Sequence, residues 1–208
     1  MSLPIPQYRN SQLSIFLFAA LTTYLVFTGK ANMFFLIYIF WWDEFIKTIF
    51  GLFNRFFRKN QIENLISYSK LLKERFFMLF IYFIFIVVVF GFVLAFSAKN
   101  LEENYITFEI LFFTNLGFNL SLLFIILREI FNYKMNDKTE KISENNLSFG
   151  ALIVLHVSII LGILLWTLAS GRFKIFDGFD ENADKFIILP FILIKFLFDW
   201  MNLKSERN

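Results

Sequence analysis

The chain of 208 residues has room for one domain, and its 58% hydrophobic residues, 33 phenylalanines and mean hydropathy of +0.62 exclude an ordinary soluble globular protein. The formal net charge of +3 is small and the basic residues gather beside long apolar runs, so no nucleic-acid partner is expected. The absence of cysteine excludes disulfides, thiolate metal sites and cysteine nucleophiles.

Long apolar runs separated by short charged blocks are typical of membrane-spanning helices rather than of barrel strands. We therefore predict an all-α fold, a single transmembrane domain over residues 1–208 built as a polytopic bundle of six spanning helices. The first apolar run resembles the core of a signal peptide, but no A-x-A-like site follows it, so we interpret it as a helix. The predicted helices cover residues 13–28, 34–53, 76–98, 106–127, 147–170 and 186–201.

The distribution of lysine and arginine between alternate loops predicts the orientation of this bundle. Thirteen of these residues fall on the side of the two termini and five on the other side. Because cytoplasmic loops carry the excess of positive charge, both termini are expected in the cytoplasm. The short turn at residues 29–32 makes the first two helices antiparallel neighbours.

A basic stretch at residues 55–75 follows the second helix, with six lysines or arginines against two glutamates. Within it, apolar residues from Ile62 to Leu72 recur at helical spacing, opposite Lys70 and Lys73. This pattern is compatible with an interfacial amphipathic helix over residues 60–75 on an anionic leaflet. It is equally compatible with a solvated segment that extends the third helix.

The second predicted helix carries charged residues in its middle. Asp43 lies about 14 Å along the helix axis from Phe34, near the centre of a hydrocarbon layer about 30 Å thick, and Glu44 and Lys47 follow it. Ionisable groups at that depth are costly and usually face the protein interior. The sequence therefore predicts a functional site or a structural ion cluster here.

The fifth and sixth helices bring more ionisable groups to the same depth. Lys195 is expected at the level of Asp43, and His156 close to it. Asp43 with Lys47, and Lys195 with Asp199, are i,i+4 pairs, so each charged helix neutralises part of its own charge. With Glu44 added, three carboxylates face two lysines, and this imbalance predicts either a protonated histidine or a neutral carboxylic acid.

Three more polar side chains belong to the candidate site. Trp42 is expected to donate its indole N–H to a carboxylate of the cluster. Asn115 and Asn119, one turn apart on the fourth helix, are expected to hydrogen-bond between helices. A single histidine and the absence of G-x-S-x-G, H-E-x-x-H and glycine-rich phosphate motifs lead us to expect no enzyme activity, and we assign no catalytic residue, metal or cofactor.

The segment from Trp41 to Glu44, with Gly51 seven residues later and Asn54 beyond, resembles an aromatic-Trp-x-Glu helix in an uncharacterised family of bacterial six-helix membrane proteins. The pair Lys195 and Asp199 is similar to a Lys-x-x-x-Asp pair near the C-terminus of that family. The resemblance implies a multi-pass helical bundle in the bacterial inner membrane. It brings no activity with it.

Two functions fit these observations. The favoured one is an accessory or scaffolding subunit, with the lipid bilayer and other membrane subunits as partners, because the charges can pair within the chain. The alternative is a small proton- or cation-coupled channel or transporter, in which Asp43 or Glu44 is the site and His156 titrates. A conduit requires these groups to line a wet cavity, whereas a subunit buries them dry.

Overall fold

The computed structural model describes residues 5–89, 101–135, 142, 152–153, 155–157, 159–161 and 192–201. Their regular structure is helical, apart from one isolated bridge between Ile62 and Ile142, so the all-α prediction is confirmed for this part of the chain. The predicted helical residues 90–98, 147–151, 154, 158, 162–170 and 186–191 lie outside it. The elements are α1 (Ile5–Phe27), α2 (Met33–Phe57), η1 (Lys59–Gln61), α3 (Leu65–Phe85), α5 (Leu101–Leu111) and α6 (Leu116–Met135), together with helical segments within 152–161 and at 192–201.

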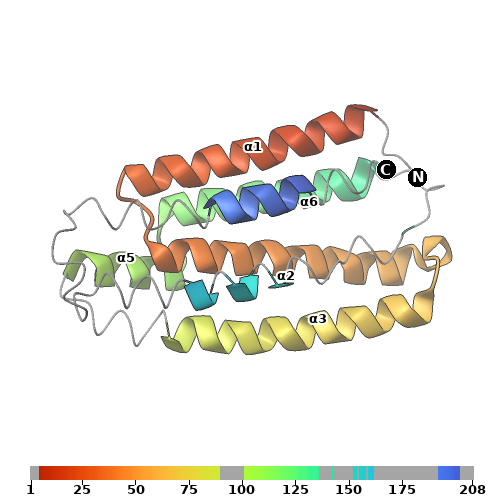
Figure 1. The fold of residues 1–208 in the computed structure, drawn as a ribbon. Helices are drawn as coiled ribbons and strands as arrows, with labels where there is room; N and C mark the ends of the chain where they lie inside the picture. The colour runs from red at the N-terminus through yellow and green to blue at the C-terminus, as the bar shows by residue number, and fades with distance from the viewer. Residues whose placement is uncertain are drawn as a thin grey trace.

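Helix α2 is the centre of the molecule. In Figure 1 the long helices α1, α2, α3 and α6 run roughly alongside one another, and α2 contacts α3, α5 and α6. Every residue from Phe34 to Trp41 is buried, with at most 5% of its surface exposed. A helix that is apolar on all sides is stable only when other elements surround it, as they do here.

The turn between α1 and α2 is formed by a glycine in the left-handed region. Gly29 has a φ of +69°, and the Lys30 amide donates back to the carbonyl of Leu25, which ends α1 in the manner of a Schellman cap. Asn32 then caps α2 by accepting from the Phe35 amide. The two helices run antiparallel, as predicted (Figure 1).

The main partner of α1 is nevertheless α6 rather than α2. Gly117 of α6 allows the close approach, because a Cβ atom at this position would lie 3.0 Å from Cδ2 of Leu25. Phe18 of α1 stacks on Phe124 of α6, with 6.5 Å between the ring centroids. The short connection sets the direction of α1, and side-chain packing selects the helix that it covers.

Residues 65–75 are the first turns of α3 and not a separate helix. The side chain of Asn64 caps α3 by accepting from the Ser67 amide. Ile62 and Leu72 are buried against the chain itself, in a small cluster with Tyr68 and Ile142, whereas Ile66 is 85% exposed. Two of the regularly spaced apolar residues, Ile62 and Leu72, therefore pack inside the protein and do not face a membrane surface.

The helix predicted at residues 106–127 is broken, which corrects the expectation of a continuous span. Phe113 has a φ of +59°, and the amides of Thr114 and Asn115 both donate to the carbonyl of Glu109. The Asn115 side chain then accepts from the Phe118 amide and starts α6. Side chains of this kind compete for backbone groups, which favours a helix start over a helix interior.

Among the described residues, one helical stretch, Tyr105–Lys134, is long and apolar enough to cross a membrane. Only 22% of its most apolar window is buried, so its surface is largely apolar and open. The stretch includes the break before α6. Gln12–Phe27 is a shorter apolar helix, and α2 carries three charged residues at its middle. One such stretch is weak evidence for a membrane protein, and the six-span bundle stays a prediction.

Candidate functional site

Two neighbouring carboxylates of α2 are the centre of the candidate site. Asp43 and Glu44 are buried, with 0% and 2% of their surface exposed. Consecutive helical residues point about 100° apart. Asp43 therefore meets Arg128 of α6, while Glu44 meets Arg75 of α3.

Asp43 binds cations from three elements. Its Oδ1 accepts from Nη2 of Arg128, and its Oδ2 lies 2.9 Å from Nζ of Lys195 and 3.0 Å from Nζ of Lys47. Lys47 is one helical turn further along α2, so this pair is the i,i+4 contact expected from the sequence. The other two partners come from α6 and from residues 192–201.

Glu44 is held in a similar way on the side of α3. Its Oε2 lies 2.9 Å from Nη2 of Arg75, and its Oε1 lies 2.9 Å from Lys47 and 3.4 Å from Lys195. Nε of Arg75 also donates to the hydroxyl of Thr48 at 3.2 Å, and this hydroxyl donates to the Glu44 carbonyl. Arg75, itself 98% buried, is thereby fixed by a charged and a neutral acceptor.

Two further carboxylates bind the cations from the outer side. We call the resulting cluster of eight residues the ion network. Asp199 lies 2.9 Å from Lys195, and Glu129 lies 2.8 Å from Arg128. Among the described residues four carboxylates therefore face four cations. The members are Asp43, Glu44, Lys47, Arg75, Arg128, Glu129, Lys195 and Asp199.

This balance corrects the charge of minus one expected from the sequence. That expectation counted three carboxylates and two cations, whereas Glu129 and the two arginines raise both numbers to four. No additional proton is needed for neutrality, because each carboxylate has at least one cationic partner within 3 Å. Buried charges of opposite sign that also hydrogen-bond can remain ionised together.

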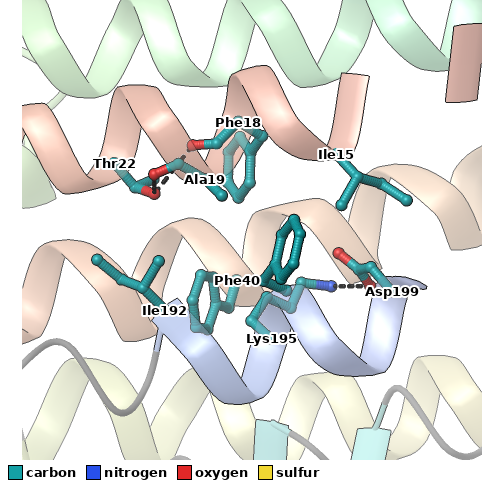
Figure 2. Close-up of a pocket in the computed structure, with 9 residues that line it drawn as sticks. Ile15, Phe18, Ala19, Thr22, Phe40, Ile192, Lys195 and Asp199 are labelled. Carbon is teal, nitrogen blue, oxygen red and sulfur yellow. Dashed lines mark hydrogen bonds and ion pairs between the residues drawn. The ribbon is translucent and has the colours of Figure 1, made fainter. Parts of the chain in front are cut away.

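The network is nearly closed to water. Lys47 is the most exposed member, at 27% of its side chain, and the cations Arg128 and Lys195 are exposed by 10% and 5%. A cavity of ≈ 10 Å³ lies beside Lys195, between α1, Phe40 and residues 192–201 (Figure 2). That is about the room for one water molecule.

The structure brings together five of the residues predicted for the site, Asp43, Glu44, Lys47, Lys195 and Asp199. His156 is not among them, since its side chain is exposed and its ring lies 5.7 Å from that of Tyr82. Tyr82 lies two helical turns along α3 from Arg75, which binds Glu44, so His156 is displaced from the ion network along the helices as well. Leu152, Leu155 and Ile159 form the buried stripe of this segment, and His156 lies beside it.

The side-chain amides of Asn115 and Asn119 form hydrogen bonds at the break between α5 and α6, and not between spanning helices as predicted. Asn115 caps α6, and Nδ2 of Asn119 donates to the carbonyl of Phe113 at 2.7 Å. The indole N–H of Trp42 is buried and has no hydrogen-bond partner among the described residues, so the expected bond to a carboxylate is absent there. It is Trp41 that donates, to the carbonyl of Leu79 at 2.8 Å.

Arg75 and Arg128 were missed because both were counted as charges outside the spans. A signal was available in the helical periodicity. Arg75 continues the stripe of Tyr68, Leu72 and Leu79, all of them buried on one face of α3. Arg128 likewise follows Phe118, Ser121 and Ile125 of α6.

No group of three or more potential metal ligands occurs within the described ranges. The charged groups of the site instead hold one another, and each carboxylate accepts from cations on its own or a neighbouring helix. Chemically, the arrangement fixes the helices with respect to one another. Within the ion network, every carboxylate is paired with at least one cation.

The model of a family of unknown function, DUF6498, matches residues 1–208, and the chain belongs to this family. This confirms the predicted membership of an uncharacterised family, while the bacterial origin and the six spans implied by the resemblance remain predictions. No curated protein and no solved structure matches the chain.

Proposed function

We propose that this member of the DUF6498 family is a multi-pass protein of the bacterial inner membrane, with both termini in the cytoplasm. In this proposal it is an accessory or scaffolding subunit of a membrane complex. The observation that carries the proposal is the ion network, in which buried charges satisfy one another at the centre of the bundle.

The distribution of side chains supports a membrane location. Charged residues occupy the interior, and large apolar residues cover the outer faces of several helices, the reverse of the pattern in soluble proteins. On α3, Phe77 and Phe80 are 65% and 61% exposed, and on α6, Leu120 and Leu127 are 52% and 56% exposed. A bilayer is the solvent in which such surfaces are stable.

The state of the ion network supports a subunit over a conduit. An ion or proton path requires groups that change partner or protonation in contact with water. Here Asp43 is buried and bound by three cations, and Arg75 holds Glu44 on its other side. Such a network favours a fixed arrangement of helices, whose apolar outer faces are then free to meet lipid or a partner subunit.

Two observations favour the alternative function, a small channel or transporter, which we retain as the second candidate. The chain breaks at Phe113, and interrupted helices are common at transporter sites. A cavity of ≈ 10 Å³ also lies beside Lys195. Both are small, and the break lies close to Tyr38 and Trp42 rather than among the charged groups of the network.

The test is proton and cation flux into liposomes that contain the purified protein, measured between pH 5 and 8 for the wild type and for Glu44→Gln. A subunit is expected to give no flux above that of empty liposomes in either form. Flux in the wild type that Glu44→Gln abolishes would overturn the subunit proposal. The exposed Glu63→Gln is the matched control for the loss of one carboxylate.

A positive test of the subunit proposal is extraction from the native membrane in a gentle detergent, followed by size separation. The expected result is a stoichiometric complex with other membrane proteins that is lost when the ion network is broken by Arg75→Leu. A wild-type chain recovered alone, folded and without flux, would contradict it.

A further inference from the structure

Apolar side chains are exposed where α2 ends and α3 begins. Phe56 and Phe57, in the last turn of α2, are 67% and 76% exposed, and Ile66, in the first turn of α3, is 85% exposed. They lie outside the predicted apolar spans, next to charged residues. Exposed apolar side chains beside charged ones indicate a binding partner that has both an apolar part and a charged or polar part.

Basic side chains surround these apolar groups. Lys59, Lys70 and Lys73 are exposed, and the Arg55 guanidinium lies 5.9 Å from the centre of the Phe56 ring. The facing acids of the same stretch are Glu63 and Glu74, and Glu74 lies only 3.9 Å from Lys70. Four cations against two carboxylates leave this stretch positively charged.

Two other arginines nearby are held within the protein and do not contribute to this surface. Nη2 of Arg58 donates to the carbonyl of Tyr133 at 2.6 Å, and its guanidinium stacks on the ring of Tyr133 at 4.2 Å. Arg75 binds Glu44 in the ion network. We define the inner-end surface as the outward-facing cations and exposed apolar residues at this end of the molecule, Arg55, Phe56, Phe57, Lys59, Ile66 and Lys70.

The depth of this surface follows from the proposed function, on which the inference rests. With Asp43 at the bilayer centre, Phe57 lies about 21 Å away along the helix axis. The hydrocarbon layer reaches about 15 Å from its centre, so Phe57 falls in the headgroup region. Because Tyr68 of α3 bonds the carbonyl of Gly51, Lys70 lies between Phe57 and the bilayer centre, and its long side chain extends towards the headgroups. Lys73 lies close to the level of Glu44, which binds the neighbouring Arg75.

We propose that the inner-end surface binds anionic phospholipid of the cytoplasmic leaflet. The lysines and Arg55 meet the phosphate and the negative headgroup, while Phe56, Phe57 and Ile66 insert between the upper parts of the acyl chains. The opposite end offers no equivalent among the described residues. There the turn between α1 and α2 carries the single cation Lys30, and α5 carries Glu109.

The experiment uses the purified full-length protein in micelles that contain equal amounts of phosphatidylglycerol and phosphatidylcholine, with the bound lipids counted by native mass spectrometry. The wild type is expected to retain phosphatidylglycerol in preference to phosphatidylcholine. A basic residue near an anionic membrane contributes about 1 kcal/mol, or about fivefold in affinity. Lys59→Gln should therefore lower phosphatidylglycerol affinity about fivefold, and Lys59→Gln with Lys70→Gln about twenty-five-fold.

Lys30→Gln is the matched control, because it removes one exposed lysine at the other end of α2 and should leave lipid preference unchanged. Equal losses in Lys30→Gln and Lys59→Gln would overturn the assignment to this surface. A protein that inserts into bilayers but retains both lipids equally would overturn the inference alone. A protein that fails to insert into bilayers of either lipid would overturn the proposed function as well.

Discussion

The ion network and the break between α5 and α6 are both polar regions of an apolar molecule, but their hydrogen bonds differ in range. At the break, Asn115 bonds the amide of Phe118 and Asn119 bonds the carbonyl of Phe113, over three and six positions. In the network, Glu44 meets Arg75 over 31 positions and Lys195 over 151.

This difference indicates separate roles for the two regions. Short-range bonds determine where one helix ends and the next begins, and they form without the rest of the fold. Long-range ion pairs form only when α2, α3, α6 and residues 192–201 are assembled. The network is therefore expected to select which helices pack together, at a cost in desolvation that the pairing offsets.

Asp43→Asn should produce the largest loss of stability, because it leaves Arg128, Lys195 and Lys47 with one carboxylate fewer. Breaking a buried ion pair from one side costs about 3–5 kcal/mol. The free energy of unfolding can be followed by tryptophan fluorescence during titration of mixed micelles with a denaturing detergent. Glu63→Gln, which removes an exposed carboxylate, should change it by less than about 0.5 kcal/mol. Similar values for the two variants would contradict a stabilising network.

Arg75→Lys should have an intermediate effect, because the charge is kept while the guanidinium bonds to Glu44 and Thr48 are not reproduced together. We expect a loss of about 2 kcal/mol, measured in the same titration. Arg55→Lys serves as the comparison at a surface position and should cost less than about 0.5 kcal/mol. If the two variants behave alike, charge alone and not geometry holds α3 to α2.

Asn115→Ala should have the smallest effect, since it removes one cap of α6. The expected loss is about 1 kcal/mol. Hydrogen exchange provides the sharper measurement, because protection should fall at the first turn of α6 and remain unchanged around Asp43. Loss of protection in both places would show that the break and the ion network are coupled, and would contradict their separate roles.

Much of the ion network was accessible from the sequence, and the reasons are physical. Asp43, Glu44 and Lys47 lie in the middle of an apolar run, and charges in such runs must find partners. Counting residues along the second and sixth predicted helices gave Lys195 the right level. The i,i+4 spacing of Lys195 and Asp199 gave a second pair, and the structure contains it at 2.9 Å.

What the sequence did not reveal depends on rotation and side-chain reach. Arg128 and Arg75 were counted among the loop charges, yet their helices extend past the predicted spans and their long side chains reach the carboxylates. His156 is exposed and contacts Tyr82, two turns along α3 from Arg75, so neither its level nor its side of the helix is that of the ion network. The break at Phe113 is not marked by glycine or proline, so only the competition of Asn115 for backbone amides could have indicated it.

The order of charges along the chain also has a consequence for synthesis. When α2 emerges from the ribosome, Asp43 and Glu44 have only Lys47 beside them, and Arg75 of α3 supplies the missing positive charge. Each later addition is a neutral pair, Arg128 with Glu129 and then Lys195 with Asp199. In the proposed membrane location, the nascent chain would therefore insert one helix at a time, with one unbalanced charge at most and only until α3 follows α2.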